Sequence, residues 1–469
     1  MEQKYNKLAK NTAIFAVGSF ASKVLSFLIV PLYTYLLSTE EYGQIDVFLT
    51  TVNFLIPIVT LQIQESMIRF LLGKEIDKNT TVSNCLLVYL ISIPVAFCSG
   101  VIYQHVYNEF VLGFLFGALV LAYSFNSIFA HYLRSIEKNV AFALKGIIET
   151  IAILGLNILF LAFFKMGVVG YLLSMLLSQL FGIVFLLISG ELLDKLNFKH
   201  LNRQVLKQML LYSIPLIPNS LMWWVMSAGD KYIINWAMGD SANGLYSLAL
   251  KIPTIVSLIY SISFQAWQMS AIEENNSEDK RKFYEKVYCV SNALLLCMTS
   301  LITMVVNPVF HIVDSKFMPS WVYVPTLVLA TVFNCQSSFF GVVYTTTKKT
   351  KNAFFTTAIG AIVNLAVNAM LIGILGLHGV TIGTCVGYIV VSLLRGRDVK
   401  NEVGMHFDLL RTGIALMILL LQIVLTIFAG YIGMFGAGIV SLAILFYLYK
   451  IEIFGILKMA TNMLKRKKR

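Results

Sequence analysis

The sequence has little charge for its length. Only 13% of its 469 residues are Asp, Glu, Lys or Arg, while 58% are hydrophobic and the mean hydropathy is +0.78. An ordinary soluble protein carries about 25% charged residues. Half that share cannot cover the surface of a water-soluble fold this long, so the composition argues against a soluble enzyme, a secreted disulfide scaffold and a nucleic-acid-binding protein.

Cysteine and histidine are also scarce, with six of each. The cysteines fall in apolar runs without a CxxC spacing, so we expect buried thiols and no disulfides. The histidines lack metal-ligand spacing, and there is no GxxxxGK[ST] sequence. No nucleophile–base pair stands out either. The sequence therefore predicts no metal, no cofactor, no ATP-driven engine and no enzyme.

What the sequence has in abundance is long apolar segments. About fourteen can be distinguished, and each is close to the roughly 20 residues that a transmembrane helix needs. The first, about 11–37, is too long for a cleaved signal peptide. We expect an all-α polytopic membrane protein with spans at 11–37, 43–70, 81–103, 110–132, 142–164, 168–190, 208–238, 243–270, 286–307, 320–345, 353–374, 378–394, 410–429 and 432–450.

The basic residues predict how these spans are oriented, because Lys and Arg concentrate on the cytoplasmic side. With the N-terminus in the cytoplasm, 31 of the 36 basic residues fall in inner segments, among them Lys145, Arg395 and the tail Lys465–Arg469. Only Lys165 and Lys316 fall in outer loops. An odd number of helices would destroy this bias. We therefore predict both termini in the cytoplasm, and the net charge of +12 is mainly a topology signal.

The polar positions of the predicted helices repeat along the chain. In the second span they recur every three or four residues from Asp46 to Gln64, and the pattern recurs from Ser247 to Gln265 in the eighth span. The sequence predicts two parallel six-helix bundles, about 1–198 and 199–402. Two extra helices and a basic tail, 403–469, follow them.

These polar stripes predict either helix packing or a hydrated cavity. Charged residues within a span cost about 2.5–3.5 kcal/mol each at mid-span, so they favour a cavity over packing. We expect Lys23, Lys231 and Lys251 to line a central cavity, with ion pairs or snorkelling as the alternative. The polar neighbours expected beside them are Asn53, Gln64, Ser227, Gln265 and Trp224, although plain packing would also explain Trp224. The acidic counterparts within spans are Asp46, Glu65, Glu149 and Asp230.

Five of the nine prolines lie in the first, second, seventh and eighth spans. Proline frees a carbonyl and kinks a helix. Kinks in polar-faced helices would suit a moving gate, but static bends are an equal alternative. The five are Pro31, Pro57, Pro215, Pro218 and Pro253.

Three stretches carry family-level motifs: Asn11–Lys23 followed by Ser38–Gly43, then Tyr212–Ile234, and then Asn243–Pro253. They resemble the opening, the seventh span and the eighth span of bacterial polysaccharide-biosynthesis (Wzx-type) oligosaccharide flippases. That family belongs to the multidrug/oligosaccharidyl-lipid/polysaccharide exporter superfamily. In helix count and order, the resemblance covers nearly the whole chain.

The resemblance implies two six-helix bundles around a central cavity, alternating access, and a multi-pass location in the bacterial inner membrane. The implied cargo is a polyprenyl-diphosphate-linked oligosaccharide, such as an O-antigen, capsule or exopolysaccharide repeat unit, moved from the cytoplasmic to the outer leaflet. By position, Lys23, Lys231 and Lys251 match the cationic residues that bind the diphosphate in the family. If a proton or sodium ion is coupled, the carboxylates available are Asp46, Glu65, Glu149 and Asp230. The implied partners are the lipid bilayer and other polysaccharide-assembly membrane proteins, and not nucleic acid.

Two other functions stay open. A drug/cation exporter, or another lipid exporter of the same superfamily, would have the same helices, but a cation exporter should have an acidic and aromatic cavity. A membrane-embedded glycan polymerase would need large outer loops with clustered catalytic residues. The largest predicted outer loop, about 308–319, is only about a dozen residues long.

Overall fold

The computed structural model describes residues 27, 29–72, 76–195, 198–273, 277, 279–347 and 349–454. Within these residues the chain is almost entirely helical and has no strand. In the described part of the chain, twelve helical runs are long and apolar enough to cross a membrane. The longest, Arg203–Ser261, covers the seventh predicted span and most of the eighth. The chain is therefore an all-α multi-pass membrane protein, as predicted. Most of the first predicted span lies outside the described residues, so the count of fourteen and the cytoplasmic termini stay predictions.

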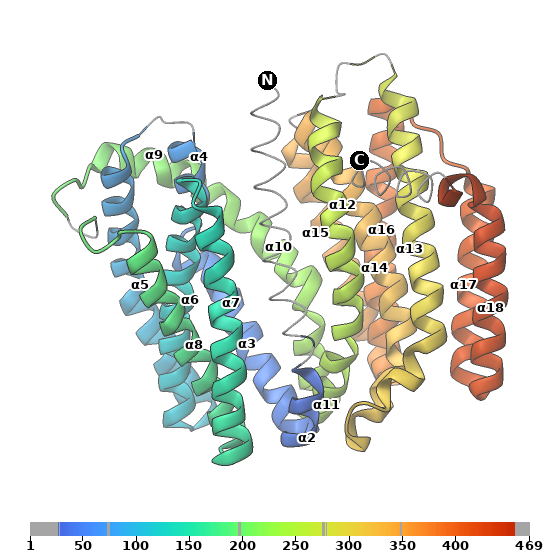
Figure 1. Ribbon diagram of the computed structural model, residues 1–469, viewed down its shortest axis with the longest axis horizontal. Helices are drawn as coiled ribbons and strands as arrows, with labels where there is room; N and C mark the ends of the chain where they lie inside the picture. Colours follow the sequence, from blue (N-terminus) through green and yellow to red (C-terminus); the bar gives the residue numbers. More distant parts are fainter. Residues whose placement is uncertain are drawn as a thin grey trace, which may run out of the picture. The chain divides into compact units, whose positions relative to one another are not determined.

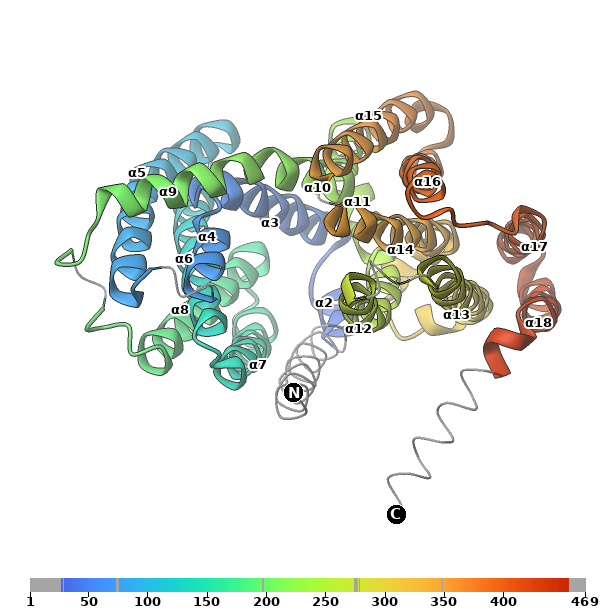
Figure 2. The same cartoon turned by 90° about the horizontal axis from the view of Figure 1, so that it is seen from above.

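The chain divides into two compact units, Met1–Trp224 and Val225–Arg469. The boundary falls inside the predicted seventh span, and the predicted domain boundaries at 198 and 402 stay predictions. The helices of the first unit, shown in Figures 1 and 2, are α2 (Val30–Leu36), α3 (Thr39–Val59), α4 (Ile63–Leu72), α5 (Lys78–Tyr107), α6 (Phe110–Ser135), α7 (Asn139–Asn157) with its π-helical continuation η1 (Ile158–Phe163), α8 (Gly167–Ser189), α9 (Arg203–Ser213) and η2 (Ile214–Leu216). The unit boundary lies within α10 (Ile217–Ala228).

Local sequence explains how the first unit is built. A capping box starts α3: the Glu41 N–H donates to Ser38 Oγ at 3.0 Å, and the Ser38 N–H donates to the Glu41 carboxylate at 2.8 Å. Glycines bring α5 and α6 together, because a Cβ on Gly113 would lie 2.7 Å from the carbonyl oxygen of Gly100. In lipid the hydrophobic effect does not drive helices together. Small residues let the two backbones approach closely, so that van der Waals packing holds the crossing.

The second unit contains α11 (Asp230–Ala249), α12 (Lys251–Glu273), α13 (Lys280–Phe310), the 3₁₀ segment η4 (Ser315–Tyr323), α14 (Val324–Thr346), α15 (Thr350–Leu375), α16 (Leu377–Val403), α17 (Leu409–Phe428) and α18 (Gly430–Leu448). Helices α17 and α18 pack against each other and against α13 (Figures 1 and 2). At Gly239, within α11, φ is +81°, which glycine adopts without strain. The turn there falls in the loop predicted between the seventh and eighth spans.

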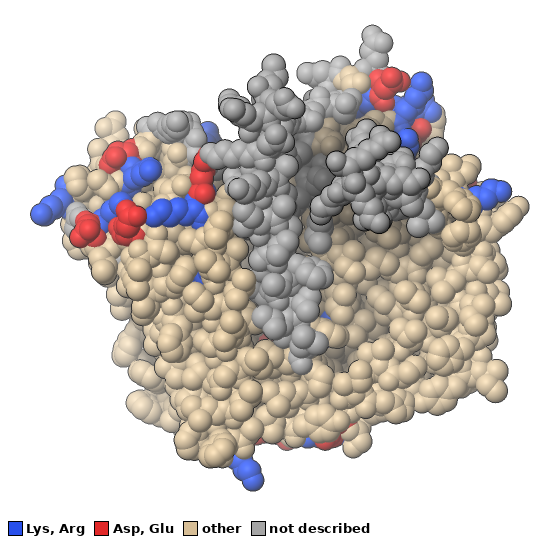
Figure 3. Space-filling model, in the orientation of Figure 1, with Lys and Arg blue, Asp and Glu red and all other residues tan. Residues whose placement is uncertain are grey.

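The flanks of both units are apolar. Phe163 in the first unit and Ile432 in the second are 82% and 90% exposed, as suits side chains that face lipid. On the face seen in Figure 3, the charged side chains of each unit gather mostly at one end. All six cysteines are free, but Cys98 is exposed, so the predicted burial was wrong for this residue. Its helix, α5, is apolar on its outward side, and an apolar run therefore does not ensure a buried position.

Two basic residues counted among the charges of the inner segments lie inside the helix packing. Arg395 on α16 is 3% exposed and donates to the Ser337 carbonyl at 2.9 Å and to the Thr357 hydroxyl at 2.8 Å. Lys145 on α7 is also largely buried. Both lie near helix ends. The charge of each residue lowers the mean hydropathy of the sequence around it. The partners of Arg395 lie on the neighbouring helices α14 and α15, whereas Lys145 pairs with Glu149 one turn further along its own helix.

A polar cavity in the first unit and a buried carboxylate in the second

The second predicted span is interrupted in the structure. Helix α3 ends at Val59 and α4 begins at Ile63, and between them Leu61 and Gln62 have φ of 52° and 54°. Pro57, in the last turn of α3, contributes to the end of the helix. Gln62 Nε2 donates to the Ser220 hydroxyl at 2.8 Å, and Gln62 Oε1 accepts from Gln64 Nε2 at 3.1 Å. The interruption thus places two carboxamides side by side within the membrane-spanning part of the unit.

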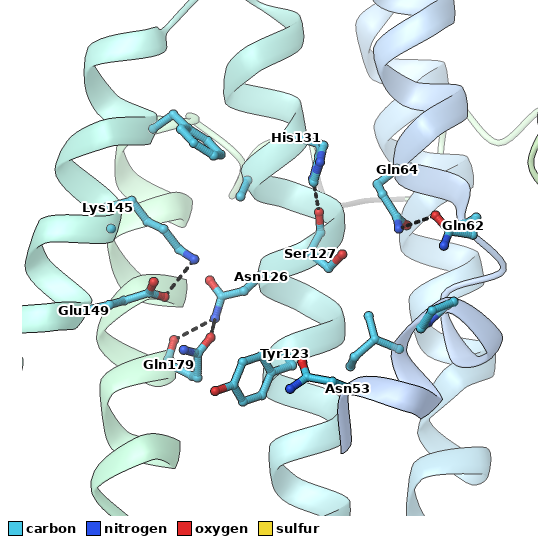
Figure 4. A pocket seen from close by; sticks show the side chains of 15 residues that line it. Asn53, Gln62, Gln64, Tyr123, Asn126, Ser127, His131, Lys145, Glu149 and Gln179 are labelled. Atoms are coloured by element: carbon cyan, nitrogen blue, oxygen red, sulfur yellow. Dashed lines mark hydrogen bonds and ion pairs between the residues drawn. The ribbon is translucent and has the colours of Figure 1, made fainter. Parts of the chain in front are cut away.

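These carboxamides line a cavity of about 530 Å³, shown in Figure 4. Its walls come from α3, α4, α6, α7 and α8. Five of the lining residues are carboxamides: Asn53, Gln62, Gln64, Asn126 and Gln179. The other polar lining residues are Tyr123, Ser127, His131, Lys145 and Glu149. Its volume lies within the range of about 300–1,000 Å³ that is typical of ligand pockets.

The amides of α6 and α8 bind each other. Asn126 Nδ2 donates to Gln179 Oε1 at 2.8 Å and to the Gln179 carbonyl at 3.0 Å. Within the described residues, Asn126 Oδ1 and Gln64 Oε1 are buried without a hydrogen-bond donor. Buried polar atoms usually find a partner. These two oxygens are therefore suited to accept hydrogen bonds from water or from a hydroxyl-bearing ligand.

A single ion pair supplies the charge of the cavity wall. Lys145 Nζ lies 2.8 Å from Glu149 Oε1, one turn along α7, and the two side chains are only 12% and 15% exposed. Gly182 on α8 leaves space for the carboxylate, since a Cβ there would lie 2.0 Å from Glu149 Oε1. Because the pair is neutral overall, the amides and hydroxyls dominate the chemistry of the cavity.

Of the predicted site residues, the structure brings three together here: Asn53, Gln64 and Glu149. Trp224 packs in the same unit, with its ring 4.6 Å from that of Phe54 and its Nε1 donating to the Thr50 carbonyl at 3.2 Å. Such contacts are expected of a tryptophan that packs between helices.

The remaining predicted residues are spread along the chain. Lys23 and the side chain of Gln265 lie outside the described residues. Lys231, in the first turn of α11, and Lys251, at the start of α12, are both half-buried. Asp46 on α3 and Glu65 on α4 are also half-buried, whereas Ser227 on α10 is exposed.

Asp230 is the most enclosed of the predicted carboxylates. It lies at the start of α11, is 3% exposed, and is held by three neutral donors from three helices. Tyr246 Oη donates to Oδ2 at 2.8 Å, Thr384 Oγ1 donates to Oδ2 at 2.7 Å, and Asn368 Nδ2 donates to Oδ1 at 2.6 Å. Gly383 permits the close approach of α15, because a Cβ there would lie 1.9 Å from Asn368 Oδ1. The carboxylate is thus stabilised by hydrogen bonds within the second unit.

Several residues that line the cavity were not predicted as site residues from the sequence. Asn126 and Gln179 are single carboxamides within apolar helices, and that isolation is the signal that could have identified them. Lys145 was counted only among the charges of the inner segments. His131, whose Nδ1 lies 2.6 Å from the Ser127 carbonyl, was set aside for lack of metal-ligand spacing.

The sequence profile of a family described as polysaccharide biosynthesis protein matches residues 8–268. No curated protein sequence matches the chain. Among solved structures, the lipid II flippase MurJ in an inward closed conformation is 14% identical with a TM-score of 0.71, covering 94% of this chain and 100% of that one. An inward-facing multidrug resistance MATE family transporter of the MOP superfamily is 14% identical with a TM-score of 0.63, covering 86% and 95%.

An outward-facing MATE transporter of the same superfamily is 13% identical with a TM-score of 0.61, covering 85% of this chain and 95% of that one. At such low identity these structures define the fold alone. The family match spans more than half of the chain and agrees with the motifs found in the sequence. This chain therefore belongs to the polysaccharide biosynthesis protein family, and its fold is the one shared by the lipid II flippase and the MATE transporters.

Proposed function

We propose that this protein is a flippase that moves a polyprenyl-diphosphate-linked oligosaccharide from the cytoplasmic to the outer leaflet of the bacterial inner membrane by alternating access. Membership of the polysaccharide biosynthesis family and the likeness to a lipid II flippase support this class of cargo. The observation that carries the proposal is the cavity of five carboxamides inside an apolar helix bundle.

The chemistry of that cavity suits the glycan part of the cargo. A sugar hydroxyl both donates and accepts a hydrogen bond, and a carboxamide can do the same from its two ends. Gln64 Oε1 and Asn126 Oδ1 are buried acceptors without a donor among the described residues. The cavity is close to neutral because Lys145 and Glu149 neutralise each other. It would therefore bind uncharged sugars better than organic cations.

The diphosphate needs a different environment, because an unpaired charge cannot cross about 30 Å of hydrocarbon. In this proposal Lys23, Lys231 and Lys251 bind it, while the polyprenyl tail stays in lipid. The membrane potential assists, since two negative charges leaving an inside-negative cell gain about 4.6 kcal/mol per 100 mV.

Asp230 is the proposed site of any counter-ion coupling. Its carboxylate is buried and held by neutral donors, so the arrival of a proton or a sodium ion would change the net charge of the site. Glu149 is less suited to this role, because Lys145 already neutralises it. Asp46 and Glu65 stay as the other acids that could contribute.

The test of the glycan site is transport by purified protein in proteoliposomes, with a fluorescent polyprenyl-diphosphate disaccharide as the probe. Asn53→Leu removes a cavity carboxamide whose only hydrogen bond in the described structure is to the Leu49 carbonyl of its own helix, at 2.8 Å. We expect the rate to fall up to about tenfold, since one hydrogen bond to the cargo is worth about 1 kcal/mol and tenfold corresponds to about 1.4 kcal/mol. Asn401→Leu, at an exposed position of α16, is the matched control and should leave the rate unchanged.

The alternatives make different predictions in the same vesicles. Export of an organic cation, with no movement of the disaccharide lipid, would establish a drug exporter and refute the proposal. Formation of polymer from lipid-linked units by this protein alone would establish a polymerase.

For the diphosphate, Lys23→Ala, Lys231→Ala and Lys251→Ala should each reduce transport while folded protein stays in the membrane. Full transport by all three would remove the lysines from the mechanism.

A further inference from the structure

A second cavity lies wholly within the second unit and has about 500 Å³ of space. Residues of α13, α14, α16, the α16–α17 connection and the first turns of α17 form its walls. Its lining combines a buried aromatic interior with three basic side chains. The proposed transport of a lipid-linked glycan does not use this cavity.

Three aromatic rings form the apolar wall. The ring of Tyr288 is stacked on that of Phe340 at 5.3 Å, and Phe407 meets both rings edge-on, at 5.6 Å from Tyr288 and 5.5 Å from Phe340. Gly396 of α16 faces this wall, because a Cβ there would lie 3.6 Å from the Phe340 ring and 3.9 Å from the Phe407 ring. The absence of a side chain at Gly396 keeps the space beside the rings open.

The basic side chains are Arg397 and Lys400 on α16 and His406 in the connection, and all three are exposed. No Asp or Glu lines the cavity. Nearby carboxylates already have partners: Asp398 accepts from Tyr344 Oη at 2.7 Å, and Glu402 pairs with Lys349 of the α14–α15 connection. Within the described residues, neither Arg397 nor Lys400 forms an ion pair.

The cavity also opens toward lipid. Leu393 of α16 and Leu409 of α17 line it and are 68% and 78% exposed. In a membrane-spanning bundle, such large exposed leucines face acyl chains. The basic residues lie at the end of α16 that the charge distribution predicts to be cytoplasmic, where anionic headgroups are found.

We propose that this cavity binds an anionic phospholipid of the cytoplasmic leaflet, with its phosphate between Arg397 and Lys400 and an acyl chain along the wall of Tyr288, Phe340 and Phe407. Charge complementarity carries the choice of occupant: the headgroup end has two cations without a carboxylate partner, and the interior is apolar. The site joins α16 to α17, so the bound lipid would stabilise the packing of the last two helices on the rest of the unit.

The experiment measures binding of phosphatidylglycerol and phosphatidylcholine to the purified full-length protein by native mass spectrometry, with thermal unfolding followed in parallel. The wild type should bind one phosphatidylglycerol tightly and unfold at a higher temperature with it. Each basic residue near a headgroup is worth about 1 kcal/mol, so Arg397→Gln combined with Lys400→Gln should weaken binding about 30-fold. Lys282→Gln removes an 84% exposed lysine from the start of α13 and should change nothing.

A second pair of variants tests the apolar part of the site without changing charge. Gly396→Leu fills the space beside Phe340 and should weaken phosphatidylglycerol binding more than tenfold, whereas Gly396→Ala should have a smaller effect and preserves the fold, because its Cβ meets only ordinary contacts. Equal affinity for phosphatidylcholine and phosphatidylglycerol would overturn the proposal, as would wild-type affinity in the charge variant. Displacement of phosphatidylglycerol by equimolar polyprenyl phosphate would also overturn it, because the cavity would then be a cargo site.

Discussion

The ion pair between Lys145 and Glu149 allows the polar cavity to be tested quantitatively by a double-mutant cycle. The 2.8 Å contact corresponds to a Coulomb attraction of about 6 kcal/mol at an effective dielectric constant of 20, before desolvation is subtracted. Removing one partner leaves a charge that is mostly shielded from water, which typically costs about 3–5 kcal/mol. Removing both leaves a neutral wall and costs far less.

We therefore expect Lys145→Met and Glu149→Gln each to lower the free energy of unfolding by about 3–5 kcal/mol, and the double variant to recover most of that loss. Chemical unfolding in detergent, followed by tryptophan fluorescence, measures all four proteins under one condition. The transport rate of the double variant separates structure from function, because a glycan that binds through carboxamides should still be carried.

Two outcomes would refute this reasoning. If the losses of the single variants simply add in the double variant, the two side chains are not coupled and the geometry of the cavity wall is wrong. If the double variant is stable but transports nothing, the ion pair itself contacts the cargo, and the amide-based account of binding fails.

Three further predictions concern buried polar contacts. Asn126→Leu removes two hydrogen bonds to Gln179 and should lower the unfolding free energy by about 1–3 kcal/mol and slow glycan transport; an unchanged unfolding midpoint would contradict the contact. Asp230→Asn should make the transport rate insensitive to an imposed proton or sodium gradient, and a variant that keeps the wild-type gradient dependence would exclude Asp230 from coupling. Arg395→Lys should lower the unfolding midpoint, because an ammonium group cannot reproduce the planar set of bonds to Ser337 and Thr357; an unaltered midpoint would mean that these bonds add little.

Much of the fold could be predicted because lipid imposes simple rules on sequence. Long apolar runs gave the helices, and the loop between the seventh and eighth predicted spans coincides with the turn at Gly239. The capping box that starts α3 lies in the Ser38–Gly43 motif. These signals are local, so the sequence alone carries them.

The site was only partly predictable because it depends on contacts between distant segments. Asn53 and Gln64 were found through their spacing on one helix face, but Asn126 and Gln179 lie on different helices and form a pair only after folding. The burial of Arg395 could not be anticipated, because Thr356 and Thr357, which accept its hydrogen bonds, lie 39 and 38 residues earlier in the chain. A hydropathy scale counts the charge of such a residue but carries no information about the partners that it contacts in the fold.

The interruption at Leu61 and Gln62 also stores conformational strain. Neither residue is glycine, and each holds a left-handed backbone that costs an L-residue roughly 1–2 kcal/mol. Packing and the Gln62–Ser220 hydrogen bond keep the break in place. A state in which these contacts separate would release the strain by letting α3 and α4 join into one continuous helix. This strain energy is available to any step of the transport cycle that opens those contacts.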